Sequence, residues 1–224
     1  PLPETAAGAI ALRAADMLPI LLEGKDAVVI GPGITTHPET ADFTHELVRQ
    51  VRVPTVIDAD GLNNMVGHLH LIEKRAVPFL LSPHPGEMAR LVGGEIGEVQ
   101  ADRLGVAGAL AQGYGVYVAL KGARTVVGYP SGETFINPTG NPGLASGGTG
   151  DVLAGLVGGF LAQGMIPGRA LAAAVFLHGT VADELAAARG NQGLIAGDLL
   201  ELLPACIKAL TEEGEGAPRP GRCE

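Results

Sequence analysis

A glycine-rich run that ends in one acidic residue is the segment best suited to chemistry. It reads Gly147-Gly148-Thr149-Gly150-Asp151 and leads directly into apolar residues typical of a helix. Glycines let backbone amides converge, and the first amides of a helix have no partner within it, so this helix start can bind a phosphate group. A carboxylate beside that anion site can accept the proton of an attacking hydroxyl. The run therefore predicts phosphoryl transfer. The plainer alternative is a connector in which Asp151 only caps the helix.

Two further polar segments follow apolar runs that read as strands. Gly31-Pro32-Gly33 is one, and a glycine turn at the end of a parallel strand is a common ligand site, although it can also be only a tight turn. Asp58-Ala59-Asp60-Gly61-Leu62-Asn63 is the other, and its oxygens suit a sugar hydroxyl or hydrated Mg²⁺. The alternative for this segment is helix capping by Asp60. The sequence does not assign separate roles to Asp58 and Asp60.

Two later segments carry a histidine and a lysine. In Ser82-Pro83-His84-Pro85-Gly86-Glu87 the prolines stiffen the loop, which would present His84 outward and leave Glu87 in the first turn of a helix. Lys121-Gly122-Ala123-Arg124-Thr125 reads as a turn between two strands. An exposed loop histidine and a solvated lysine are the alternatives for these two side chains.

Other polar residues favour structural interpretations. Asn137 and Asn141 flank a short loop and are expected to hydrogen-bond its backbone. His178 lies in an apolar helical run and is expected to be a buried structural histidine. Neither expectation adds a ligand-binding residue.

The elements that must position these residues alternate along the chain. Short apolar runs typical of buried parallel strands alternate with helical segments, which predicts a mostly parallel sheet covered by helices on both faces. The last strands are too close together for crossover helices and indicate a short antiparallel meander. The expected strands are residues 27–30, 55–57, 77–81, 116–120, 125–127 and 133–136, and the expected helices are residues 6–22, 38–51, 87–91, 98–112, 151–163, 167–188 and 197–210. Residues 211–224 are rich in Glu, Gly and Pro and are expected to be a disordered tail.

The five motifs, taken in order, resemble one known family. The segments at residues 31–33, 56–63, 82–87, 121–125 and 147–151 are similar to those of ribokinase-like kinases and, more narrowly, of the ADP-dependent NAD(P)H-hydrate dehydratases. The resemblance covers roughly residues 2–210, which implies one ribokinase-like domain of three layers, α/β/α. The strand and Gly-Ala turn with which family members begin have no match here, so the domain is expected to be N-terminally incomplete.

The resemblance also implies a function and roles for particular residues. The implied reaction is repair of the S epimer of hydrated NADH or NADPH: the ring hydroxyl is phosphorylated and phosphate is then eliminated, with Asp151 as catalytic base and Mg²⁺ on the nucleotide. Gly33, His84 and Asp151 would bind the substrate, and Glu87 would support Mg²⁺ through water. The nucleotide, ADP or ATP, would be held by Lys121, Gly122, Ala123, Arg124, Thr125, Gly148, Thr149 and Gly150.

Composition narrows the class of protein. The formal net charge of −9 makes binding to nucleic acid or an anionic membrane surface unfavourable. No uninterrupted apolar run in the sequence is long enough to span a bilayer, and the setting of the two cysteines does not suggest a disulfide, which favours the cytoplasm. The family resemblance implies a homo-oligomer, with a tetramer as one possibility. The alternatives are a ribokinase-like kinase of a small alcohol or vitamin precursor and a non-catalytic nucleotide-binding module.

Overall fold

A single six-stranded sheet forms the centre of the molecule. The computed structural model describes residues 1–216 of the chain. The strands follow the chain order β1-β2-β3-β4-β5-β6; β1 to β4 are parallel, and β5 and β6 are antiparallel. The sheet therefore confirms the predicted parallel core and antiparallel meander. The strands are β1 (Val28–Ile30), β2 (Thr55–Ile57), β3 (Phe79–Leu81), β4 (Tyr117–Leu120), β5 (Val126–Gly128) and β6 (Thr134–Ile136).

Alternating side chains of the strands build two apolar cores. Ile57 and Leu81 point into one core, while their neighbours Val56 and Leu80 point into the other. Because both faces of β2 and β3 are buried, these strands consist of apolar residues throughout. Helices must cover both faces, which gives the three-layer α/β/α arrangement that the sequence predicts.

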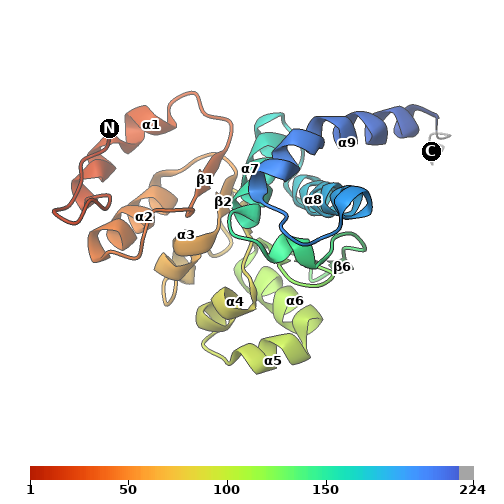
Figure 1. Cartoon of the computed structure of the whole chain (residues 1–224). Coiled ribbons are helices and arrows are strands. Elements are labelled where there is room, and N and C mark those ends of the chain that lie inside the picture. Colours follow the sequence, from red (N-terminus) through yellow and green to blue (C-terminus); the bar gives the residue numbers. More distant parts are fainter. Residues whose placement is uncertain (217–224) are drawn as a thin grey trace, which may run out of the picture.

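The helices divide between the two faces. Apolar residues of α2, α3, α4 and α6 pack into the first core, and those of α7 and α8 pack into the second, with α9 packed on α7 and α8. Figure 1 shows α7, α8 and α9 gathered on one side of the molecule. The helices are η1 (Leu12–Met17), α1 (Leu18–Leu22), α2 (Pro38–Gln50), α3 (Ala59–Asn64), η2 (Leu69–Leu71), α4 (Pro85–Val92), α5 (Ile96–Ala101), α6 (Arg103–Tyr114), η3 (Pro142–Ala145), α7 (Thr149–Ala162), α8 (Pro167–Arg189) and α9 (Ala196–Gly216).

Two predicted helices are divided in the structure. The expected helix at residues 6–22 is wrong over its first part, where Glu4 pairs with Ile10 and Gly8 has a φ of 75°. The rest is η1 followed by the short α1, with Pro19 in the first turn of α1. The expected helix at residues 98–112 divides at Asp102, whose side chain caps α6 by accepting a hydrogen bond from the Gly105 amide over 2.8 Å. Local capping outweighs the continuous helical pattern here.

The C-terminal helix is longer than expected. The sequence predicts disorder from residue 211, but α9 continues to Gly216. The hydroxyl of Thr211 donates back to the Ile207 and Lys208 carbonyls, and Lys208 pairs with Glu212 over 3.6 Å. These contacts lie within single helical turns, so the helix extends past its last core residue. Residues 217–224 of the expected tail lie outside the described residues.

Close packing fixes α7 and α8 against the sheet. By length and composition alone α8 would be long enough to cross a membrane, but half of its most apolar window is buried inside the fold. Along α7, Gly158 faces Val29 of β1 so closely that a Cβ at this position would overlap the valine side chain. The absence of a side chain at Gly158 therefore sets how closely α7 approaches the sheet.

Candidate active site

The carboxyl ends of β1 and β2 are joined by a close backbone contact. Gly31 has a φ of 137°, and a Cβ at this position would overlap the carbonyl oxygen of Asp58. The amide of Asp58 donates to the Ile30 carbonyl over 3.1 Å, so the two strand ends are held in register. Gly33 has a φ of 74° and open space beside it, where a ligand could approach. Gly31 therefore allows a close backbone contact, whereas Gly33 allows a positive φ beside open space.

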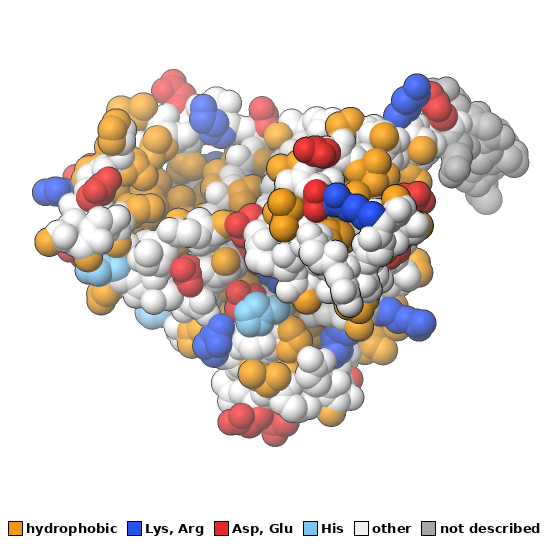
Figure 2. All heavy atoms as spheres, in the orientation of Figure 1, with side chains coloured by type: hydrophobic (Ala, Val, Ile, Leu, Met, Phe, Trp, Pro, Cys, Tyr) orange, Lys and Arg blue, Asp and Glu red, His pale blue; other side chains and the backbone are white. Residues whose placement is uncertain are grey.

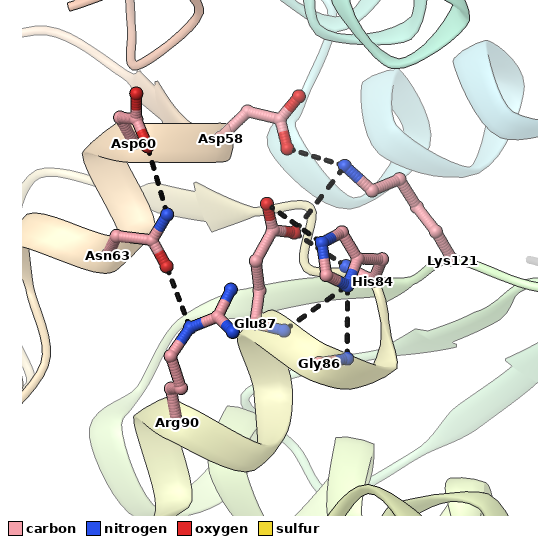
Figure 3. A network of polar contacts seen from close by, with 8 residues as sticks. All are labelled: Asp58, Asp60, Asn63, His84, Gly86, Glu87, Arg90 and Lys121. Atoms are coloured by element: carbon pink, nitrogen blue, oxygen red, sulfur yellow. Dashed lines mark hydrogen bonds and ion pairs between the residues drawn. The ribbon is translucent and has the colours of Figure 1, made fainter. Parts of the chain in front are cut away.

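An ion pair links the end of β2 to the end of β4. Lys121 Nζ lies 2.6 Å from Asp58 Oδ1 and 3.8 Å from Glu87 Oε2 (Figure 3). Asp58 is 1% exposed and Glu87 is 5% exposed, whereas the side chain of Lys121 is 21% exposed. Lys121 is thus the cation nearest to two buried carboxylates. The alternative of a freely solvated lysine is wrong.

The structure gives the two aspartates of the Asp58-Ala59-Asp60 segment different partners. Asp58 is the N-cap of α3 but makes no capping hydrogen bond, because its side chain pairs with Lys121. Asp60 lies in the first turn and accepts a hydrogen bond from the Asn63 amide over 3.0 Å, and Asn63 in turn accepts one from Arg90 over 2.9 Å (Figure 3). The alternative of capping by Asp60 is therefore wrong. Asp58 faces the site, while Asp60 holds the side chain of Asn63, which ties α3 to α4 through Arg90.

His84 and Glu87 form a capping box at the start of α4. His84 Nδ1 accepts from the amides of Gly86 and Glu87 over 3.0 and 3.2 Å, and Glu87 Oε2 accepts from the His84 amide over 2.7 Å (Figure 3). Because Nδ1 is an acceptor here, a neutral ring carries its proton on Nε2. The His84 side chain is still 51% exposed, which agrees with the expectation that it points outward. Glu87 lies in the first helical turn, as predicted.

The glycine-rich helix start lies against the ion pair. Gly148 is the N-cap of α7 with a φ of 84° and offers no capping side chain. At Gly150 a Cβ would lie 3.6 Å from Lys121 Nζ and 3.7 Å from Asp58 Oδ2. The uncapped first amides of α7 therefore open beside Lys121, which combines the positive end of a helix with an ammonium group. Asp151 is exposed in the same turn.

Thr149 has a structural side chain. It is buried, and its hydroxyl lies within hydrogen-bonding distance of the Leu144 and Ser146 carbonyls, at 2.7 and 2.8 Å. Its own carbonyl accepts from Nε2 of His178 over 2.9 Å. Burial lowers the pKa of His178 from 6.5 to about 4, so this histidine is neutral near pH 7. His178 is thus a buried structural residue, as the sequence predicts, and it anchors the start of α7.

The loop before α7 is held by its own side chains and by one residue that sequence reasoning missed. Asn137 donates to the Thr139 carbonyl over 2.9 Å, and Asn141 accepts from the Gly143 amide over 2.9 Å, as expected. Asp183 of α8 also accepts from the Gly140 amide and the Asn141 side chain, over 2.8 and 3.0 Å. Only the three-dimensional contact identifies Asp183, because no local pattern surrounds it in the sequence.

The oxygen atoms near Lys121 suit magnesium only in part. Carboxylates of Asp58 and Glu87 are the hard ligands that Mg²⁺ prefers, and the buried hydroxyl of Ser82 at the end of β3 has no hydrogen-bond partner in the described part of the chain. Within residues 1–216 no group of three or more His, Cys, Asp or Glu side chains could hold a metal alone. This arrangement fits a Mg²⁺ ion that takes only some of its ligands from the protein.

Two surface hollows lie away from this edge. One, of about 450 Å³, is lined by Pro19, Leu22 and Arg52 among others, and the other, of about 200 Å³, lies between α8 and α9. Neither is lined by a residue of the site. Figure 2 shows acidic, basic and histidine side chains gathered near the middle of the visible face, below the group formed by α7 to α9. The site is thus an open polar surface in this structure, and its chemistry identifies it better than its shape does.

Comparison with known proteins gives a consistent result. Residues 3–205 match the NAD(P)H-hydrate dehydratase family. The chain is 46% identical over 214 residues to a bifunctional NAD(P)H-hydrate repair enzyme of Moorella thermoacetica, covering 96% of this chain and 40% of that protein. It is 35% identical over 188 residues to an ADP-dependent (S)-NAD(P)H-hydrate dehydratase of Bacillus subtilis, covering 84% of this chain and 66% of the relative. The chain therefore spans about 40% of the length of the bifunctional relatives.

A solved structure shares the fold. The ADP/ATP-dependent NAD(P)H-hydrate dehydratase of Bacillus subtilis, crystallised with ATP and Mg²⁺, is 34% identical and aligns with a TM-score of 0.72 over 84% of this chain and 66% of that one. This similarity confirms the ribokinase-like architecture expected from the sequence.

Proposed function

Because the chain belongs to the NAD(P)H-hydrate dehydratase family, we propose that it dehydrates the S epimer of hydrated NADH and NADPH, with ADP as phosphoryl donor. One observation carries the proposal. The uncapped start of α7 opens against the Asp58–Lys121 pair, with the His84–Glu87 capping box beside it. An anion site, a cation and buried carboxylates thus meet where the parallel strands end, the usual ligand site of open α/β sheets.

The proposed substrate site uses Gly33, His84 and Asp151. Gly33 offers open space at the end of β1, and His84 has a half-exposed ring that a ligand could reach, with its Nε2 3.4 Å from Glu87 Oε1. Asp151 is exposed, and no hydrogen bond or ion pair engages its carboxylate within residues 1–216, so the carboxylate would be available to the ring hydroxyl. The nucleotide would lie across the first turn of α7, formed by Gly148, Thr149 and Gly150, and the turn at residues 121–125. Thr149 would not contact the nucleotide through its side chain, because its hydroxyl is engaged internally.

The reaction then proceeds in two steps. Asp151 accepts the proton of the ring hydroxyl as that oxygen bonds to the terminal phosphorus of ADP, and AMP leaves with the electrons of the broken P–O bond. The first amides of α7 and the ammonium of Lys121 stabilise the charge on the transferred group. In the second step the ring nitrogen donates its lone pair, the ring C–O bond breaks and phosphate leaves. Loss of a neighbouring ring proton restores the reduced nicotinamide.

Magnesium would be held by the nucleotide and by the carboxylates near Lys121. When bound, Mg²⁺ supplies positive charge to the phosphate oxygens. Asp58 Oδ2 faces Gly150 and takes no part in the 2.6 Å contact with Lys121, so it is one candidate oxygen. Glu87 is already engaged with the His84 amide, so we propose that it acts through water.

An absorbance assay tests the proposal. The chain is incubated with NADH hydrate, Mg²⁺ and either ADP or ATP, and the absorbance of reduced nicotinamide is followed. We expect NADH to form, and parallel reactions with NADPH hydrate measure the preference between the two substrates. A stable phosphorylated product without reduced nicotinamide would instead identify a kinase of the same fold. Nucleotide binding without any product would identify a non-catalytic module.

We also propose the setting in which the activity operates. Residues 1–210 would act as one ribokinase-like unit within a homo-oligomer in the cytoplasm, without nucleic-acid or membrane partners. The net charge of −9 supports the last point, because an acidic surface is repelled by phosphate-rich polymers. Light scattering of the purified chain measures the oligomeric state, and a monomeric mass would contradict the proposed assembly.

A further inference from the structure

The guanidinium of Arg103 lies against the inner side of the turn at residues 121–125, called here the 121–125 turn. From the start of α6, Nη1 of Arg103 donates to the Ala123 carbonyl over 2.6 Å, and Nη2 donates to the Leu120 carbonyl over 2.8 Å. A longer contact of 3.4 Å reaches the Arg124 carbonyl. At Gly122 a Cβ would lie 2.9 Å from Nη2 of Arg103, so the guanidinium fills the space that a side chain would need. One side chain thus contacts two carbonyls of the turn and the carbonyl just before it.

The 121–125 turn has a strained backbone. Gly122 has a φ of 145° and Arg124 has a φ of 56°, and the second value is unfavourable for a residue with a side chain. Such conformations persist where surrounding contacts enforce them, and they are common at ligand-binding sites. The Arg103 guanidinium supplies such contacts at the carbonyls of Ala123 and Arg124. At the other end, the Lys121 amide donates to the Pro83 carbonyl over 2.8 Å.

These contacts orient the amides of the turn. In a planar trans peptide the C=O of one residue and the N–H of the next point in opposite directions. Because the Ala123 and Arg124 carbonyls point toward Arg103, the amides of Arg124 and Thr125 point away from it. No backbone carbonyl within residues 1–216 accepts from either amide. The exposed side of the turn therefore presents free N–H donors, the groups that bind an anion.

We propose that Arg103 is a positioning residue for the nucleotide: it holds the 121–125 turn so that free amides and Lys121 face the phosphates. This inference rests on the proposed function, because it takes the turn to be part of the nucleotide site. Arg103 does not touch the ligand in this arrangement, since its guanidinium is on the opposite side of the turn.

An arginine suits this role better than a lysine. The guanidinium is a planar fork that can donate to two carbonyls at once, whereas an ammonium is a single point charge. Nε of Arg103 is buried without a partner in the described part of the chain, and burial lowers the pKa of the group. A buried group with an unsatisfied donor costs stability, which is consistent with a residue retained for geometry.

Arg75 provides a matched control. Its guanidinium is also partly buried, and it donates to the Val48 and Arg49 carbonyls at the end of α2, over 2.7 and 3.3 Å. Arg103→Met and Arg75→Met therefore remove the same kind of contact from different places. If loss of a buried guanidinium only weakens the fold, both variants should behave alike.

Two measurements on the full chain test the inference. Calorimetric titration with ADP and Mg²⁺ is expected to show affinity weakened on the order of 10-fold or more in Arg103→Met, a typical effect of removing a group that orients binding residues. Arg75→Met should bind ADP like the wild type, and Arg103→Lys should fall between the two. The KM for NADH hydrate should change little in any variant. Hydrogen exchange without ligand should be faster at the Lys121 amide, which donates to the Pro83 carbonyl, in Arg103→Met only.

The outcomes separate this inference from the proposed function. Wild-type ADP affinity in a folded Arg103→Met, or equal losses in both methionine variants, would overturn the role of Arg103 and leave the proposed function standing. If the wild type itself binds no ADP, the proposed function fails. In that case, unchanged hydrogen exchange at the Lys121 amide of the 121–125 turn in Arg103→Met would also contradict the inference that Arg103 fixes the turn.

Discussion

At the scale of single residues, the site depends on how charges are distributed between buried and exposed side chains. Asp58 and Glu87 are buried beside Lys121, while Asp151 is exposed in the first turn of α7. A buried carboxylate needs its cation, so Asp58 has a structural role as well as any ligand role. An exposed carboxylate has no such requirement and can be dedicated to chemistry. We therefore expect replacement of Asp151 to affect activity and replacement of Asp58 to affect stability.

Asp151→Asn should remove activity without affecting the fold. The amide keeps the size of the side chain but cannot accept the hydroxyl proton, and loss of a general base costs roughly 10²- to 10⁴-fold in rate. Because the side chain is exposed, the free energy of unfolding should change by less than about 0.5 kcal/mol. Turnover of NADH hydrate and urea unfolding measure the two effects. Wild-type turnover in this variant would exclude Asp151 as the base.

Asp58→Asn should lower stability, while Asp60→Asn serves as its control. Removing the carboxylate leaves the partly buried Lys121 ammonium with Glu87 at 3.8 Å as its nearest partner. The full cost of breaking a buried pair is reduced by the partial exposure of the lysine, so we expect a loss of about 1–2 kcal/mol. Asp60 contacts only the Asn63 amide among these residues, and its replacement should cost less. Equal losses in urea unfolding would contradict the distinction between the two aspartates.

The sequence predicts the identity of the site residues better than their pairing. The spacing of acids and glycines after each strand singles out Asp58, Glu87, Lys121 and the start of α7, since strand ends of a parallel sheet meet at one edge. It does not indicate that Lys121 turns back to Asp58, because that contact joins residues 63 positions apart. Arg103 and Asp183 carry no motif at all. Their roles follow from carbonyls and amides that only the folded chain brings within reach.

At the scale of elements, backbone contacts at strand and helix ends set the geometry of the site. β1 and β2 meet at Gly31 and Asp58, and α8 holds the start of α7 through the contact between His178 and the Thr149 carbonyl. Local features decided where the predicted helices divide, because Asp102 caps the start of α6 and Pro19 lies in the first turn of α1. Hydrophobic pattern alone does not show such boundaries, which depend on one or two hydrogen bonds.

Gly31→Ala should disturb the joint between β1 and β2. A Cβ there would overlap the Asp58 carbonyl oxygen, and the φ of 137° is unfavourable for alanine. Strain and overpacking together should cost at least about 2 kcal/mol. Gly24→Ala is a control, because Gly24 has a φ of 64° but open space beside it and should lose only about 1 kcal/mol. Thermal unfolding compares the two variants, and equal midpoints would contradict the overlap at Gly31.

At the scale of the whole molecule, the order of strands follows the order of the chain from β1 to β6. The parallel crossovers all run over the same face, which brings α2, α3, α4 and α6 together and leaves the other face to α7 and α8. This layering could be predicted from the alternation of apolar runs and helices. The length of α9 could not, because beyond its last buried residue, Cys206, the helix is stabilised by contacts of Lys208 and Thr211 within it.

The free energy of unfolding should fall as the pH is lowered from 6.5 toward about 4, the range between the two pKa values of His178. Its pKa is near 4 in the folded chain and 6.5 in the reference state, so the unfolded chain binds the proton first as pH falls below 6.5. The free energy of unfolding should drop by about 2 kcal/mol between pH 7 and pH 5 from this residue alone. His178→Gln keeps a donor for the Thr149 carbonyl but does not titrate. Urea unfolding at both pH values should therefore show a weaker pH dependence in this variant.

The close approach of Gly158 to Val29 makes the tilt of α7 depend on its contact with β1. Gly158 lies seven positions after Asp151, which corresponds to roughly 10 Å along the helix axis. A side chain added at Gly158 would lift the middle of the helix and tilt its start, moving the carboxylate relative to the nucleotide. A substitution deep in the α7–sheet interface would thus reduce turnover as if it lay within the site, although it touches no ligand. The position of Asp151 thus depends on Gly158, about two turns further along the same helix.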